Sequence, residues 1–217
     1  MKTDMIFDQE AREKLILGVE KLTEAVRITL GPMGKTVAIC LDGETPHLTK
    51  DGVTVANAVS LPDIYENIGA ALVREAAQRS AAVAGDGTTT ATILAHEIIK
   101  QGDKVIAAGH STVEILEGMR SAAEMVVAEL EKTRVQISND RLIDVATISA
   151  NGDSLLGELI SNAIIRVGAD GAVSVQEAKG YETTLTVVDG TFIDRGYESP
   201  YFATDSVRQV AELDAPE

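Results

Sequence analysis

The chain has 217 residues, enough for one large domain or two smaller ones, and its hydrophobic fraction of 45% is ordinary for a globular protein. Aromatic residues make up only 3%, so the core has to be built from Ala, Val, Leu and Ile, which suits closely packed helices. The 34 acidic and 19 basic residues give a net charge of −15, which argues against nucleic acid and anionic membranes as partners.

Targeting signals and disulfides are not expected. The N-terminus, Met1 to Asp8, has no apolar signal region, and no apolar run approaches the roughly 18 residues of a membrane span. Cys40 is the only cysteine, which excludes an intrachain disulfide, and we expect it to be a small core residue of a strand. These features predict a soluble, cytoplasmic protein.

The chain begins with a predicted helix and a hairpin. Apolar residues at three- and four-residue steps predict an amphipathic helix that Asp8 caps and Gly31-Pro32 ends. Residues 36–41 and 47–49 are predicted strands, joined by a turn at Asp42-Gly43. The buried face of the helix is predicted to consist of Ala11, Leu15, Val19, Leu22, Val26 and Thr29.

Helices dominate the next hundred residues. A short helix is predicted at 53–59, and a long one ends at Gly85. The long helix is marked by Ile64, Ile68, Leu72, Ala76 and Val83, and the buried stripe of the next one is predicted at Ala91, Leu94, Ala95 and Ile98. Ser111 and Glu114 form a capping box for a further helix.

The last third of the chain has a different pattern. Ser138 and Asp153 are predicted to cap two helices, the second of which ends at Gly168. Short strands are predicted at 173–175 and 185–188.

The stretch Gly85-Asp86-Gly87-Thr88-Thr89-Thr90 carries the chemistry. Threonine hydroxyls and N–H groups at a helix N-terminus favour an anion, and Asp86 would repel a bare phosphate unless a cation, most simply Mg²⁺, lay between them. The stretch therefore predicts a magnesium–phosphate site. It is not a P-loop, which ends in Gly-Lys-Ser/Thr. The alternative is an ordinary loop with one threonine N-cap, which leaves the other threonines and the aspartate unexplained.

Four motifs occur along the chain in a fixed order: Thr29-Leu30-Gly31-Pro32, Lys50-Asp51-Gly52-Val53, Gly85-Asp86-Gly87-Thr88-Thr89-Thr90-Ala91-Thr92, and Asp194-Arg195-Gly196-Tyr197 with Ser199-Pro200-Tyr201-Phe202. In order and spacing they resemble the group I (GroEL-type) chaperonins, of which this chain corresponds to an N-terminal portion.

The resemblance implies a mainly α fold of three parts. Residues 1–133 would form the first half of a helical, ATP-binding equatorial-type domain with an inserted β-hairpin. Residues 134–190 would begin a small α+β intermediate-type domain, and 191–217 the incomplete start of an apical-type domain. In the family the hairpin pairs with strands of a neighbouring subunit.

The resemblance also implies site residues. Backbone atoms of Thr29, Leu30, Gly31 and Pro32 would line the nucleotide, with Lys50, Gly87, Thr88, Thr89 and Thr90 on the phosphates, Asp86 on Mg²⁺ and Asp51 orienting the attacking water. Tyr197, Tyr201 and Phe202 resemble the family's surface for unfolded polypeptides. In simpler interpretations Lys50 is a solvated hairpin lysine, Asp51 a turn aspartate, and the aromatic residues a core cluster around Pro200.

The resulting hypothesis is an ATP-dependent molecular chaperone, a chaperonin ATPase of the isomerase class with ATP and Mg²⁺ as cofactors. Its partners would be unfolded polypeptides, a co-chaperonin and other chaperonin subunits in a ring, with no nucleic acid and no membrane. One alternative is a non-catalytic assembly module that docks to full-length chaperonin. Another is an unrelated magnesium–nucleotide phosphotransferase, weakened by the lack of an acceptor-activating base outside the motifs.

Overall fold

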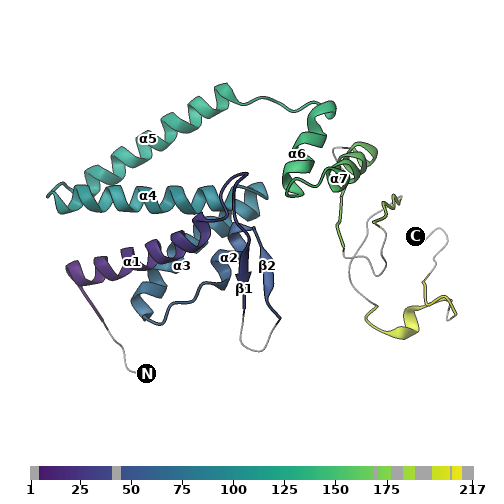
Figure 1. Ribbon diagram of the computed structural model, residues 1–217, viewed down its shortest axis with the longest axis horizontal. Coiled ribbons are helices and arrows are strands. Elements are labelled where there is room, and N and C mark those ends of the chain that lie inside the picture. The colour runs from purple at the N-terminus through teal and green to yellow at the C-terminus, as the bar shows by residue number, and fades with distance from the viewer. Residues whose placement is uncertain are drawn as a thin grey trace. The chain divides into compact units, whose positions relative to one another are not determined.

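The computed structural model describes residues 5–40, 45–168, 171–176, 183–188, 197–205 and 207–211. The chain divides into two compact units, residues 1–132 and 133–217. The described residues are mainly helical and include one two-stranded antiparallel sheet, which confirms the predicted fold class (Figure 1). Within the described part of the chain, no helix combines the length and the apolar character that a membrane crossing requires. The division into three domains stays a prediction.

The first unit contains most of the regular structure. Its elements are α1 (Asp8–Arg27), β1 (Val37–Ile39), β2 (His47–Thr49), α2 (Gly52–Ala58), α3 (Ile64–Ala84), α4 (Thr88–Ala107) and α5 (Thr112–Thr133). The hairpin is as predicted, with Val37 opposite Thr49 and Ile39 opposite His47. The turn predicted at Asp42-Gly43 lies outside the described residues.

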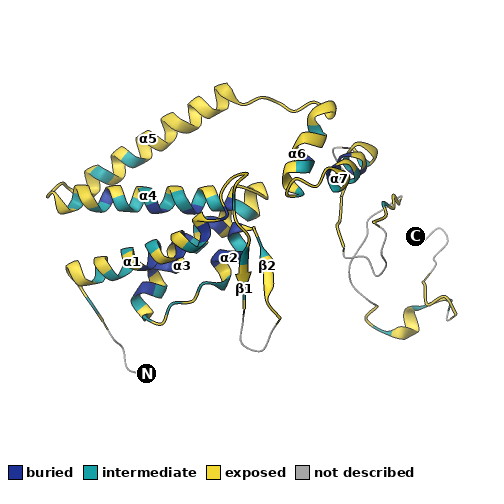
Figure 2. Ribbon diagram, in the orientation of Figure 1, coloured by how far each residue is buried: buried dark blue, intermediate teal, exposed yellow. Residues whose placement is uncertain are grey.

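The core of this unit lies where α1, α2 and α3 meet (Figure 2). Its fully buried members are Val19, Leu22 and Val26 of α1, Val55 and Ala56 of α2, and Ala70 and Val73 of α3. Three residues of the buried face predicted for α1, Val19, Leu22 and Val26, lie in this core, which confirms that part of the prediction. Since burial of apolar surface is the main stabilising term in folding, this cluster holds the three helices together.

Glycines allow α1 and α3 to cross in backbone contact. A Cβ at Gly18 of α1 would collide with the backbone of Glu66, and a Cβ at Gly69 of α3 would collide with the backbone of Leu15. The two helices therefore approach more closely than any residue with a side chain would allow at these positions.

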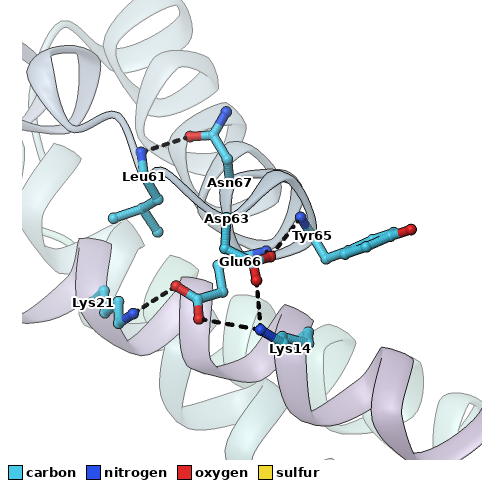
Figure 3. A network of polar contacts seen from close by, with 7 residues as sticks. All are labelled: Lys14, Lys21, Leu61, Asp63, Tyr65, Glu66 and Asn67. Atoms are coloured by element: carbon cyan, nitrogen blue, oxygen red, sulfur yellow. Dashed lines mark hydrogen bonds and ion pairs between the residues drawn. The ribbon is translucent and has the colours of Figure 1, made fainter. Parts of the chain in front are cut away.

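A polar network lies beside this crossing (Figure 3). The Glu66 side chain is only 8% exposed and accepts a hydrogen bond of 2.5 Å from Lys21 of α1. Asp63 accepts from the N–H groups of Tyr65 and Glu66 at the start of α3, and it also accepts from Lys14 Nζ at 2.5 Å. The hydrogen bond with Lys14 lowers the pKa of Asp63, and the same bond raises the pKa of Lys14.

The predicted buried stripe of α4 is wrong at its two large residues, whereas Ala91 and Ala95 are half-buried and Ala95 packs against the core. Leu94 is 57% exposed and Ile98 is 53% exposed. Ile98 instead lines a cavity of about 320 Å³ together with Leu72 of α3 and Leu116 of α5. The buried positions of α3 and α4 are mostly small or polar residues: Glu66, Gly69, Ala70, Val73 and Ala77 in α3, and Thr88, Thr92, His96 and Gly102 in α4. Close helix packing selects small residues, so the bulky ones lie beside the contacts.

Three local predictions in the first unit are also wrong. The N-cap of α1 is Phe7, not Asp8, and it makes no side-chain hydrogen bond. The helix ends at Arg27, before Gly31-Pro32, because the N–H groups of Thr29 and Leu30 already bond three residues back. Cys40 is exposed and follows β1, which ends at Ile39, so it is not the core residue of a strand.

The second unit contains short helices: η1 (Asn139–Arg141), α6 (Leu142–Ser149), α7 (Ser154–Val167) and η2 (Pro200–Phe202). Asp153 caps α7 as predicted, accepting from the N–H groups of Leu155 and Leu156 at 3.0 Å. Ser138 is the N-cap of η1 but makes no side-chain cap bond. Helices α6 and α7 pack closely, since a Cβ at Gly157 would collide with Thr147.

The two strands predicted in the second unit are wrong. Residues 173–175 and 185–188 are described, and neither segment belongs to a strand. Alternating apolar residues form a stable strand only when a neighbouring strand supplies the backbone hydrogen bonds. The boundary predicted near Gly190 and the stretch Asp194-Arg195-Gly196 lie outside the described residues.

Candidate functional site

The loop between α3 and α4 turns on two glycines. Gly85 ends α3 with a φ of 70° and donates its N–H to the Ala81 carbonyl at 3.0 Å. Gly87 has a φ of 76° and is the N-cap of α4. Both conformations are left-handed, which glycine adopts without strain. The predicted break between two helices at this motif is confirmed.

Asp86 lies between the two glycines and is exposed. Its Oδ1 accepts the N–H of Gly87 at 2.6 Å, and its carbonyl oxygen accepts the hydroxyl of Ser80 at 2.7 Å. The carboxylate is therefore held just before the first turn of α4 and is open to solvent.

The first turn of α4 presents a positive end. The first intrahelical bond there runs from the N–H of Ala91 to the Gly87 carbonyl, so the N–H groups of Thr88, Thr89 and Thr90 lie before the hydrogen-bonded part of the helix. Thr88 is buried and Thr90 is exposed. Free N–H groups together with the helix dipole suit an anion such as phosphate.

The segment after α1 reaches this turn through Thr29. The Thr29 Oγ1 lies 3.1 Å from the Thr89 Oγ1 and donates to the Val26 carbonyl at 2.8 Å. Thr29 is buried, whereas Leu30, Gly31 and Pro32 are exposed. The first and third motifs, 60 residues apart in sequence, are thus in direct contact.

The second motif meets the same turn through Gly52. A Cβ at this position would collide with the Thr89 Oγ1 and would lie 3.0 Å from the Thr88 Oγ1. The turn that carries Lys50 and Asp51 therefore lies against α4. Lys50 is exposed, and its ammonium makes no ion pair within the described ranges.

Asp51 has a structural role in this arrangement. It is the N-cap of α2, and its Oδ2 accepts from the Thr54 N–H at 2.8 Å and from the Thr54 hydroxyl at 2.5 Å. The sequence analysis missed this cap, although an aspartate just before a predicted helix is a common N-cap. Arg74 of α3 holds the other end of α2 by donating to the carbonyls of Ala56 and Val59.

The residues present fit a magnesium–phosphate group. Asp86 supplies one carboxylate, and no cluster of three or more His, Cys, Asp or Glu that could hold a metal occurs in the described part of the chain. A Mg²⁺ ion needs no such cluster, because it keeps several waters and takes phosphate oxygens beside one or two carboxylates. Lys50 and the N–H groups of α4 can balance the phosphate charge.

The aromatic residues of the fourth motif belong to the second unit. Tyr197 and Phe202 are exposed, and Tyr201 is 98% exposed. The Tyr197 hydroxyl accepts the N–H of Ala211 at 2.9 Å, and the Ser199 hydroxyl accepts the N–H of Tyr201 at 3.4 Å. These side chains do not form the core cluster around Pro200 that was the alternative interpretation.

Comparison with known proteins identifies one family. The family model described as the TCP-1/cpn60 chaperonin family matches residues 22–213. The solved chaperonin gp146 from the bacteriophage EL 2 (Pseudomonas aeruginosa), in the presence of ATP-BeFx, is 28% identical with a TM-score of 0.65; the match covers 75% of this chain and 29% of that one.

A group III chaperonin in the open state is also similar. It is 27% identical with a TM-score of 0.61, and the match covers 72% of this chain and 32% of that one. The chain thus spans about a third of the length of the solved chaperonins that it matches, and its helical part resembles their equatorial domain.

Proposed function

The chain belongs to the TCP-1/cpn60 chaperonin family, and we propose that it binds Mg–ATP where the first turn of α4 meets the ends of α1 and α2. The observation that carries this proposal is the convergence of three separate motifs on Thr89, through the hydroxyl of Thr29 and the bare backbone of Gly52. Helix packing alone does not explain why these glycines and hydroxyls lie beside the exposed carboxylate of Asp86 and the exposed Lys50.

Each residue has a defined task in the proposed site. Asp86 holds Mg²⁺, while the N–H groups of α4 and the hydroxyl of Thr90 bind phosphate oxygens. Lys50 supplies a positive charge close to the same turn. Leu30, Gly31 and Pro32 form an exposed loop whose backbone can line the nucleotide.

The proposed reaction is hydrolysis of the terminal phosphate. Bound Mg²⁺ would neutralise the charge that develops on the phosphate oxygens. Asp51 would orient the attacking water as a hydrogen-bond acceptor, while its Oδ2 is held by the N–H and the hydroxyl of Thr54. Positioning of this kind needs no covalent nucleophile.

The chaperone activity as a whole belongs to the proposal. The proposed assignment to group I (GroEL-type) rests on the four motifs. The partners proposed from this assignment are unfolded polypeptides, other chaperonin subunits and a co-chaperonin. Tyr201 and Phe202 support a polypeptide surface, because exposed aromatic rings provide large apolar contact area.

Calorimetric titration with ATP tests the nucleotide site. We expect weak binding that requires Mg²⁺ and is lost in Asp86→Asn, because the amide can still accept the Gly87 N–H but no longer attracts the cation. Asp140→Asn, at an exposed position of the second unit, is the matched control and should bind like the parent. Equal affinity with and without Mg²⁺ would contradict the proposal.

Suppression of aggregation tests the polypeptide surface. We expect the parent chain to slow aggregation of an unfolded protein weakly and without ATP, and Tyr201→Ala/Phe202→Ala to abolish the effect. Tyr197→Phe is the control, since it removes only the hydroxyl that bonds Ala211. Suppression that survives the double substitution would place polypeptide binding elsewhere.

A further inference from the structure

We infer that Thr29 is a positioning residue: its buried hydroxyl fixes the direction of the Thr89 hydroxyl at the candidate nucleotide site. This inference rests on the proposed function and assigns a side-chain role to Thr29, where the sequence motif implies only backbone contact. The carrying observation is a chain of two hydrogen bonds that runs from the Val26 carbonyl through Thr29 to Thr89.

The direction of both bonds follows from counting protons. A threonine hydroxyl has one proton and two lone pairs. The Thr29 residue is 8% exposed, and its proton is donated to the Val26 carbonyl, which can only accept, at 2.8 Å. Toward Thr89, at 3.1 Å, the Thr29 oxygen can therefore only accept. Thr89 must be the donor of the second bond.

This direction decides what Thr89 can offer a ligand. With its proton committed to Thr29, the Thr89 oxygen presents lone pairs only. It can accept a hydrogen bond from water or an ammonium group, or coordinate a cation, but it cannot donate to a phosphate oxygen. The hydroxyl of Thr90 is exposed and bonds no described residue, so its proton stays available for phosphate.

Gly52 holds the same hydroxyl from a second side. Because a Cβ at position 52 would collide with the Thr89 Oγ1, that oxygen lies directly against the backbone at the start of α2. The Thr89 hydroxyl is thus fixed between the ends of α1 and α2 before any ligand binds. Such preorganisation reduces the ordering cost of binding.

The test is a set of Mg–ATP titrations on the full chain. Thr29→Val keeps the shape and removes the hydroxyl, and Thr29→Ser keeps the hydroxyl and removes a methyl group. We expect Thr29→Val to weaken Mg–ATP binding about two- to twelvefold, the range of one net hydrogen bond, and Thr29→Ser to bind like the parent. If Thr29 acted only through packing, Thr29→Ser would weaken Mg–ATP binding more than Thr29→Val.

A double-substitution cycle tests the pairing itself. We expect Thr29→Val/Thr89→Val to bind no more weakly than Thr89→Val alone, because the two hydroxyls act as a unit. Thr90→Val should combine additively with Thr29→Val. Urea unfolding of each variant, measured without nucleotide, should show the same coupling between Thr29 and Thr89.

Two outcomes separate this inference from the proposed function. A parent chain that binds Mg–ATP but shows additive effects of Thr29→Val and Thr89→Val, or equal loss in Thr29→Ser and Thr29→Val, overturns the positioning role alone. A parent chain that binds no Mg–ATP overturns the proposed function, and the positioning role with it.

Discussion

At the scale of single residues, Asp51 combines a cap with a proposed catalytic role. We expect Asp51→Ala to destabilise the chain by about 1 kcal/mol, because the Thr54 N–H loses its acceptor, whereas Asp51→Asn keeps the cap and most of the stability. Phosphate release should be slow in the parent and absent from both variants. Urea unfolding and a phosphate assay measure the two effects, and release by Asp51→Asn at the parent rate would show that the carboxylate is not needed.

The pair of Asp63 and Lys14 predicts a pH dependence of stability. The folded pKa of Asp63 is lowered from its ordinary 3.8, mainly by the hydrogen bond from Lys14. Asp63 therefore contributes its full stabilisation to the folded state above pH 3.8, and this stabilisation is lost as the pH falls through the lowered pKa of the folded state. We expect Asp63→Asn, which keeps the cap of α3, to be less stable than the parent at pH 7 and to approach it in acid.

Urea unfolding at several pH values measures this difference. Lys14→Gln should remove only part of this pH dependence, because the N–H groups of Tyr65 and Glu66 still lower the pKa of Asp63 after the hydrogen bond from Lys14 is lost. A constant difference between parent and Asp63→Asn from pH 7 to pH 2.5 would contradict the prediction.

At the scale of elements, glycines determine how α1 and α3 pack. We expect Gly69→Ala to destabilise the chain by about 1–3 kcal/mol, because the new Cβ collides with the Leu15 backbone and forces the helices apart. Gly118 is the matched control: it lies within α5, and a Cβ there meets nothing within 4 Å. Gly118→Ala should stabilise the chain by about 0.5–1 kcal/mol, the usual gain in a helix interior. Thermal unfolding distinguishes the two signs.

The terminal helix of the first unit is packed differently from the others. Helix α5 has no buried residue (Figure 2). Its Ile115 and Leu116 line the apolar cavity that Ile98 of α4 also lines. Packing against the described residues thus holds α1 to α4 far more firmly than α5. Elements with few buried contacts open first, so we expect α5 to exchange its amide protons faster than α1.

At the scale of the whole molecule, the hairpin bears on assembly. Strands β1 and β2 form a two-stranded sheet, and neither outer edge is paired within the described residues. A two-stranded sheet is marginally stable and its free edges invite further pairing. We expect the 217-residue chain alone to form monomers or irregular aggregates, since the family's partner strands are supplied by other segments. Light scattering that showed one discrete ring-sized particle would contradict this.

Most helices could be predicted from the sequence, because their signals are local. The α1 face repeats every three to four residues, and Asp153 and Gly168 mark the two ends of α7. The break at Gly85 and Gly87 could be predicted for the same reason, since glycine adopts a left-handed backbone without strain. The magnesium–phosphate interpretation came from these local features and stays a prediction.

Only the tertiary structure decided which surfaces meet. Leu94 and Ile98 fit the period of a buried helical stripe, yet both are exposed. The closest contacts between helices are made by small residues such as Gly18 and Gly69, which lie against neighbouring backbones. The contact of Thr29 with Thr89 joins residues 60 positions apart, and no periodic pattern encodes it. Local hydrogen bonds and backbone geometry depend on adjacent residues and can be read from sequence, whereas these contacts depend on how several helices pack together.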